Sequence, residues 1–110
     1  MKCAATINAG VCGFTTNLTA DSEDDQMVTL TIETDCDKIA GLAETLHTTP
    51  IDAYQEIAKG FDGVVLSAAR ATLSGCCAGC AVPVGLFKAL QAAARVALPR
   101  PVAIDLRAAD

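Results

Sequence analysis

At residues 27–34 the chain reads MVTLTIET, the cleanest alternation of apolar and polar side chains in the sequence. Val28, Leu30 and Ile32 fall on one side, with threonine or glutamate at the positions between and after them. A period of two with many β-branched residues predicts a strand that buries one face. The stretch therefore predicts a sheet with one face in the core and the other in solvent.

Two similar stretches precede it, at residues 2–8 and 14–20. Their predicted inward residues are Cys3, Ala5 and Ile7 in the first, and Phe14, Thr16 and Leu18 in the second. Glycines at 10 and 13 mark the first connection, and the acidic segment 21–26 forms the second. Short connections of this kind favour three antiparallel strands in sequence.

The chain after residue 34 changes to a helical period. Thr34 or Asp35 can cap a first helix whose apolar stripe is Ile39, Leu42, Ala43 and Leu46. Thr49-Pro50 predicts a short second helix that ends at Gly60, with Ile51, Tyr54 and Ile57 inward.

Two further helices are predicted before the C-terminus. Asp62 can cap a third helix through Val65, Leu66, Ala69 and Leu73, although residues 64–66 also fit a buried strand. A loop at 74–81 leads to a last helix that opens at Pro83 and is broken by Pro99 and Pro101. The inward residues of this last helix are Leu86, Leu90, Ala93, Ala94 and Ala97. Val102, Ile104 and Leu106 then alternate with other residues, which predicts a closing strand.

The order of these elements predicts one α+β domain over residues 1–110. It has three N-terminal antiparallel strands, three or four helices on one face of the sheet and one C-terminal edge strand. We expect that edge strand beside the first strand.

Composition excludes several classes of protein. The net charge of −5 argues against a nucleic-acid binder, and no apolar run is long enough to predict a membrane span. The first residues do not resemble an export signal, so we expect a cytoplasmic protein in a reducing compartment. The 21 alanines give a core of small side chains that leaves apolar surface to cover, which makes a homodimer plausible.

Six cysteines are the unusual feature of the composition. Facing residues of a hairpin share a face, so strands 14–20 and 27–34 have two plausible registers. In one, Cys12 faces Cys36; in the other, Cys12 faces Thr34 and Cys36 is diagonal to it. Both registers put Cys12 and Cys36 on adjacent strands at one end of the hairpin.

The remaining cysteines are Cys3, expected in the core, and three in the loop 74–81. Cys36 and Cys80 lie near predicted helix N-termini, where backbone N–H groups stabilise a thiolate. Cys77 and Cys80 have the spacing that lets two sulfurs reach one metal ion. We therefore predict Cys12, Cys36, Cys77 and Cys80 as metal ligands, with Cys76 as the alternative fourth ligand.

Thiolate ligands suit zinc or an iron–sulfur cluster. The corresponding function is a metal or iron–sulfur protein that transfers electrons or carries a cluster. One alternative is a thiol-redox protein that uses Cys77 and Cys80 with an unknown protein redox partner. Another is a non-catalytic accessory or assembly domain whose cysteines are core residues. The only histidine, His47, fits the C-terminus of a helix better than a ligand, and whether the protein is an enzyme stays open.

The shared site depends on the direction of the closing strand. The last helix is about one strand long, so it starts at one end of the sheet and finishes at the other. If the closing strand runs parallel to the first strand, or antiparallel to the third, Cys80 lies at the Cys12 and Cys36 end. If it runs antiparallel to the first strand, Cys80 lies at the opposite end. The thiol cluster requires one of the first two arrangements.

Four short segments together resemble one small uncharacterised family from anaerobic bacteria and methanogenic archaea. They are NAGVCGF at 8–14, Asp35-Cys36, Cys80-Ala81-Val82-Pro83 and Leu98-Pro99. The family's third motif has proline where this chain has Ala81. The resemblance implies that Cys12, Cys36 and Cys80 belong to the family signature. It implies no function, and an anaerobic setting would favour an iron–sulfur cluster over a disulfide.

Overall fold

The computed structural model describes residues 1–109. Three strands come first, β1 (Lys2–Asn8), β2 (Thr15–Asp21) and β3 (Met27–Thr34). They form an antiparallel meander, extended at the β3 edge by the two-residue strand β4 (Ile51–Asp52), in the order β1-β2-β3-β4. The three N-terminal strands and the α+β class are therefore confirmed. The fourth strand lies mid-chain, so the predicted C-terminal edge strand is wrong.

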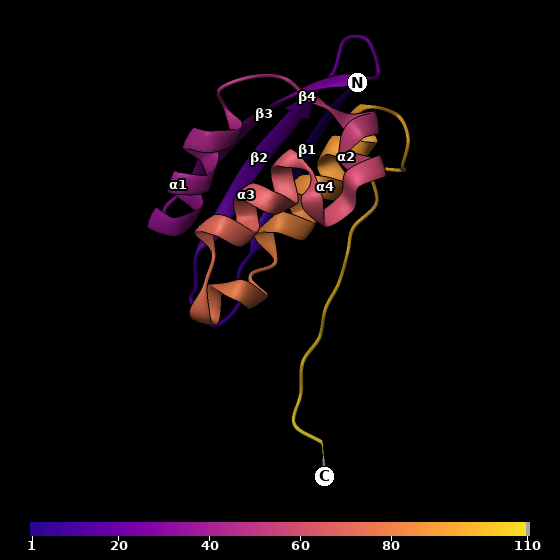
Figure 1. The fold of residues 1–110 in the computed structure, drawn as a ribbon. Helices are drawn as coiled ribbons and strands as arrows, with labels where there is room; N and C mark the ends of the chain where they lie inside the picture. Colours follow the sequence, from indigo (N-terminus) through magenta and orange to yellow (C-terminus); the bar gives the residue numbers. More distant parts are fainter. Residues whose placement is uncertain (110) are drawn as a thin grey trace.

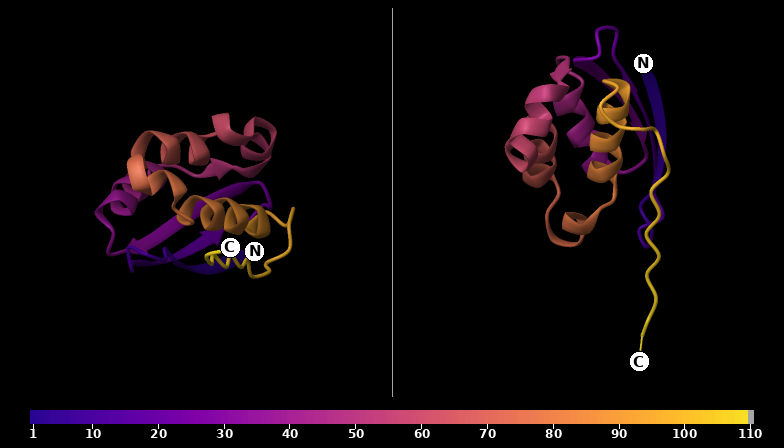
Figure 2. Two further views of the ribbon diagram at one scale, coloured as in Figure 1. Left: turned by 90° about the horizontal axis from the view of Figure 1, so that it is seen from below. Right: turned by 90° about the vertical axis from the view of Figure 1, so that its right-hand side faces the viewer.

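The helices cover one face of this sheet (Figures 1 and 2). They are α1 (Asp37–Leu46), α2 (Ala53–Lys59), α3 (Val64–Thr72) and α4 (Val82–Ala93), with 3-10 turns η1 (Gly60–Asp62) and η2 (Gly75–Gly79). Helix α4 packs on β1 and β2, and α1 packs on β3. Helix α3 lies further out, mainly against α1 and α4. The right-hand view of Figure 2 shows the sheet at one side and the helices stacked away from it.

The strand and α1 patterns position the core as their sequences predict, except that Phe14, predicted inward, precedes β2 and is 40% exposed. Cys3 of β1, alternate residues of β2 and β3, and the α1 stripe are buried in one cluster. The buried residues of α1 are Ile39, Leu42, Ala43 and Leu46. Apolar spacing alone identified these faces because each packs on a single neighbouring layer.

The β2–β3 register differs from both predicted registers by a shift along the strands. Leu18 faces Ile32 and Thr16 faces Thr34. The connecting turn is centred later than assumed, on Asp25, which adopts a φ of +63°. Asp24 accepts the backbone N–H groups of Gln26 and Met27, and these hydrogen bonds hold its pKa below the usual value. The inward face is unchanged because the shift conserves the two-residue period.

The second helix begins later than predicted. Ile51 pairs with Val28 in β4 instead of opening a helix, and Asp52 caps α2 by accepting the N–H groups of Tyr54 and Gln55. A hydrogen bond from the Gln26 side chain, followed by the backbone bonds, lowers the pKa of Asp52. Tyr54 and Ile57, predicted inward, are exposed.

The buried positions of α2 are Ala53 and Glu56. Gly60 does end this helix, as predicted, with a φ of +57°. The third helix is capped by Gly63 and Glu56 instead of Asp62.

Helix α4 ends earlier than the prolines predict. Its last helical residue is Ala93, and Arg95 adopts a φ of +62° that turns the chain back. Residues 96 and 97 form a bend, and residues 98–109 then follow as a segment that enters no sheet ladder. We call residues 96–109 the C-terminal tail. The alternation at Val102–Leu106 is typical of a strand, but the tail forms no ladder with any strand of the described chain.

The run Gly75–Ala93 is long and apolar enough to cross a membrane by length and composition alone. In the structure this run is not one regular helix, since η2 ends at Gly79 and α4 begins at Val82. Helix α4 buries one face against the sheet. The apolar character of α4 is therefore accounted for by packing within the domain.

Candidate functional site

Strand pairing brings two cysteine-containing segments to the same end of the sheet. Asn8 pairs with Thr15, so the turn that contains Cys12 lies at the end of β1. Thr16 pairs with Thr34, so Cys36 follows β3 at that same end. Both residues lie just outside the strands, not on them as predicted, because β2 starts only at Thr15 and β3 stops at Thr34.

The start of α4 places Cys80 at this end as well. A Cβ built on Gly85 would lie 2.6 Å from Cδ1 of Ile7, so this part of α4 crosses directly over the last residues of β1. Cys80 precedes Gly85 by about one and a half helical turns, beyond the end of the strand. Figure 1 shows η2 and the β1–β2 turn together at the lower end of the molecule.

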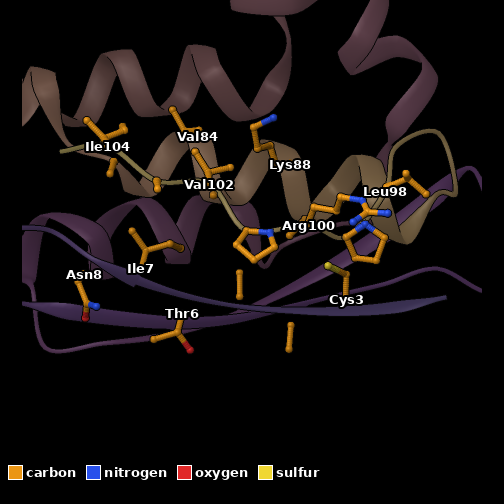
Figure 3. Close-up of a pocket in the computed structure, with 18 residues that line it drawn as sticks. Cys3, Thr6, Ile7, Asn8, Val84, Lys88, Leu98, Arg100, Val102 and Ile104 are labelled. Carbon is orange, nitrogen blue, oxygen red and sulfur yellow. The ribbon is translucent and has the colours of Figure 1, made fainter.

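The direction of the C-terminal tail is one of the two that place Cys80 at the same end as Cys12 and Cys36. Figure 3 shows Leu98 toward the Cys3 end of β1 and Ile104 toward the Asn8 end, so the tail runs parallel to β1. It does so without forming a strand. We call the end that carries Cys12, Cys36, Cys76, Cys77 and Cys80 the thiol end.

The β1–β2 turn presents Cys12 to solvent. Ala9 donates its N–H to the Phe14 carbonyl (3.0 Å), and Gly13 donates to the Gly10 carbonyl (2.9 Å). Gly10 and Gly13 adopt φ values of +85° and +75°, which other residues rarely reach. Cys12 is exposed at the tip of this hydrogen-bonded loop.

A pair of threonines holds Cys36 at the start of α1. The Thr16 and Thr34 hydroxyl oxygens are 2.9 Å apart and share a hydrogen bond across the strands. Thr34 Oγ1 also accepts the backbone N–H of Cys36 (3.2 Å). Cys36 is the N-cap residue of α1 and is partly buried against the core. Its thiol therefore sits on a fixed backbone at the helix N-terminus.

Turn η2 and the residue that follows it, Cys80, carry the other three thiols of the thiol end. The Cys77 N–H donates to the Ser74 carbonyl (3.2 Å), and the Cys80 N–H donates to the Cys77 carbonyl (3.1 Å). Cys80 Sγ accepts the backbone N–H of Val82, the first residue of α4 (3.5 Å). Cys77 and Cys80 are partly buried against the core, whereas Cys76 is exposed. This difference in burial favours Cys77 over Cys76 as the ligand that this turn supplies.

The five thiols gather at one end without forming a closed ligand set. All six cysteines are free. Within residues 1–109, no three His, Cys, Asp or Glu side chains lie close enough together to hold one metal ion. The ligand assignment from the sequence thus stays a prediction, and metal binding at this end requires the turns to draw together.

A match to a family model covers residues 3–106, and its description is a family of unknown function, DUF6951. The chain belongs to the DUF6951 family. The matched region contains all six cysteines and most of the C-terminal tail. A search of curated proteins and a search of solved structures each found no match. The family match therefore covers the whole fold and the thiol end. Because the family has no known function, any function must be argued from the residues of this chain.

His47 has a structural role in this DUF6951 protein. It is the C-cap residue of α1, and its Nε2 accepts the backbone N–H of Ile32 (2.9 Å). That N–H lies on the side of β3 that the short β4 does not reach, because β4 pairs only with Met27 and Val28. The imidazole thus accepts a hydrogen bond from a backbone N–H that has no strand partner at this point of the β3 edge.

Glu56 is the polar residue that sequence reasoning missed. Its side chain is only 2% exposed, and its two carboxylate oxygens accept the N–H groups of Val64 (2.9 Å) and Val65 (2.7 Å). A Cβ on Gly63 would lie 2.8 Å from Oε2, so glycine is needed beside the carboxylate. The only signal in the sequence was an acid on the inner face of a short amphipathic helix. Glu56 fixes the start of α3, which leads into η2.

Cys3 serves as an internal control for the thiol end. It is 9% exposed and belongs to the core cluster, near the opposite end of β1. We expect Cys3→Ala to lower the free energy of unfolding by about 1 kcal/mol, the typical cost of a small core change. Metal content, measured by elemental analysis, should not change. Loss of bound metal in this variant would place Cys3 in the site and contradict the assignment.

Proposed function

We propose that the thiol end binds a soft metal, as zinc or as an iron–sulfur cluster, and that the protein carries that metal or transfers electrons through it. One observation carries the proposal. Three segments far apart in the chain, the β1–β2 turn, the β3–α1 junction and η2, deliver five of the six thiols to one end. Thiolates are the ligands that zinc and iron–sulfur clusters prefer.

Within this proposal, Cys36 and Cys80 are the anchored ligands. Each lies at the N-terminus of a helix that packs on the sheet, and each is partly buried. The backbone N–H that Cys80 Sγ accepts would stabilise a thiolate there. N–H groups directed at sulfur also tune iron–sulfur clusters.

Cys12 and Cys77 are the ligands whose turns must shift when the metal binds. Cys76 is the alternative fourth ligand. Cys12 lies between Gly10 and Gly13, and η2 is flanked by Gly75 and Gly79. Around a single zinc ion, metal–sulfur bonds of about 2.3 Å bring four sulfurs within about 4 Å of one another. Glycine-rich turns give the backbone freedom to reach that separation. Binding at these thiols would also keep them reduced, which suits a cytoplasmic compartment.

A titration of the reduced protein with Zn²⁺ against a competing chelator tests the ligand set. We expect Cys36→Ser and Cys80→Ser each to weaken Zn²⁺ binding by more than about 100-fold. This exceeds the loss of affinity that is typical when a residue hydrogen-bonded to a ligand is replaced. Cys12→Ser should weaken binding as well. Cys3→Ala, the matched control, should bind as the parent does. Equal affinity in the parent and in Cys36→Ser and Cys80→Ser would refute the proposal.

The redox alternative has one observation in its favour. Cys77 and Cys80 are three residues apart at the end of one short turn, joined by the Cys80 N–H to Cys77 carbonyl hydrogen bond. Such a dithiol would pass two electrons and two protons to the disulfide of a partner protein and become a disulfide itself. The variants separate the two functions. Redox cycling needs Cys77 and Cys80 and is indifferent to Cys36→Ser, whereas metal binding needs Cys36.

A further inference from the structure

The C-terminal tail exposes a row of apolar side chains. Val102, Ile104 and Leu106 are 54%, 70% and 89% exposed. They alternate with Ala103, Asp105 and Arg107, which is the pattern of a strand with one buried face. An extended, alternating, apolar segment without a ladder partner is prone to pair with another strand. The family match extends through Leu106, so these residues belong to the DUF6951 unit.

The open edge of β1 lies beside the tail. Strand β1 pairs with β2 on one side only and is the edge of the sheet. A groove of about 650 Å³ runs along it, lined by β1, by Val84, Gly85 and Lys88 of α4, and by tail residues 98–104. Figure 3 shows Val102 and Ile104 along this groove, with Val84 and Lys88 of α4 bordering it. The open β1 edge and the strand-like tail thus lie next to each other without forming a ladder.

Direction decides which β1 strand the tail can join. The tail runs parallel to the β1 of its own chain, whereas all pairs within the sheet are antiparallel (Figure 3). Suppose that two copies meet along their β1 edges about a twofold axis perpendicular to the strands. The β1 of the second copy then runs opposite to that of the first, and so opposite to the first copy's tail. Antiparallel pairing is the more stable ladder per residue.

The hinge of the tail is suited to exchange. Arg95 turns the chain at a φ of +62°, and its side chain is held by Asp25 (3.2 Å). Pro99 and Pro101 cannot donate a backbone N–H, so regular pairing begins only at residue 102. Residues 96–101 form the arm that leads to residues 102–106, and no strand ladder holds those residues against their own domain.

We propose that this protein forms a twofold dimer by exchange of C-terminal tails. Residues 102–106 of each chain add an antiparallel strand to the β1 edge of the other. Val102, Ile104 and Leu106 then enter the groove between β1 and α4. Such an interface is isologous, and the main-chain ladder and the apolar pockets both contribute to it. The exchange would close both open β1 edges.

Light scattering coupled to size exclusion, in reductant and with the full chain, tests the oligomeric state. We expect a mass twice the 11.3 kDa of the chain. Ile104→Asp, and truncation after Pro101, should each give the single-chain mass with unchanged circular dichroism. Ala103→Asp places the same charge on the solvent side of the tail and should stay dimeric. A parent that is monomeric throughout, or an Ile104→Asp variant that stays dimeric, would overturn the proposal.

Hydrogen exchange distinguishes strand exchange from other contacts. In the dimer, the backbone amides of residues 102–106 should exchange about tenfold more slowly than the amide of Leu98, which precedes the predicted ladder. Ile104→Asp should abolish this protection. Protection of 102–106 in a monomer would mean that the tail docks on its own β1. A dimer with an unprotected tail would mean that another surface joins the copies. Either result overturns tail exchange.

Discussion

Glu56→Ala is expected to lower the free energy of unfolding by about 3 kcal/mol, because hydrogen bonds to a charged group each contribute roughly 1.5–3 kcal/mol. The substitution removes the acceptor for the N–H groups of Val64 and Val65 at the start of α3. The Val65 bond is buried, so no water can replace the carboxylate without opening the helix start. Urea unfolding monitored by circular dichroism measures the change.

Two variants calibrate this result. Glu44→Ala removes an exposed glutamate from α1 and should change stability by no more than about 0.5 kcal/mol. Glu56→Gln keeps one acceptor oxygen in place and should fall between Glu56→Ala and the parent. If Glu56→Ala unfolds at the same urea concentration as Glu44→Ala, the carboxylate does not hold α3.

Gly85→Val should cost about 3 kcal/mol, the upper part of the ordinary range for overpacking. A Cβ at this position would lie 2.6 Å from both Cγ1 and Cδ1 of Ile7, so either the isoleucine or the helix must move. This contact keeps the start of α4, and with it Cys80, over the end of β1. The same urea experiment gives the free energy.

The double variant Gly85→Val with Ile7→Ala should recover most of that loss, since it removes the atoms that clash. Gly41→Val is the matched control. Gly41 also lies inside a helix, but a Cβ there meets nothing within 4 Å. Its substitution should be close to neutral. Equal destabilisation at Gly41 and Gly85 would mean that helix preference, not the contact with Ile7, sets the cost.

The N-terminal half of the fold was predictable because each element there packs on one layer. The alternation in β1 and β3 and the stripe from Ile39 to Leu46 report their burial directly. Apolar spacing failed at residues 51–57, where Ile51 joins a two-residue strand and a glutamate fills an inward position of the helix. Burial of Glu56 depends on the N–H groups of α3, which lie outside its own helix.

The β2–β3 register and the tail failed for different reasons. Parity identified the inner face, but the centre of the turn depends on Asp25 adopting a positive φ, which composition does not specify. Val102–Leu106 has a strand pattern, but the tail runs parallel to the β1 edge beside it and forms no ladder with that edge. The alternation therefore indicates that the segment can form a strand with a suitable partner. It does not show that the segment is a strand within a single chain.

The sequence made the place of the thiol end conditional on the direction of the chain after α4, which it left open. The structure supplies that direction, and Figure 1 shows η2 beside the β1–β2 turn. Whether Cys12, Cys36 and Cys80 can bind one metal ion together depends on distances of a few ångströms within glycine-rich turns. Spacing in the sequence does not determine such distances.

The metal content of protein expressed and purified without oxygen decides whether the thiol end binds a metal, with the visible absorbance spectrum recorded on the same sample. We expect about one zinc ion per chain without colour, or iron with matching acid-labile sulfide and a broad visible band. Cys36→Ser and Cys80→Ser should lose the metal, and Cys3→Ala should keep it. Parent protein that binds neither zinc nor iron, with all six thiols titrating freely, would contradict the account.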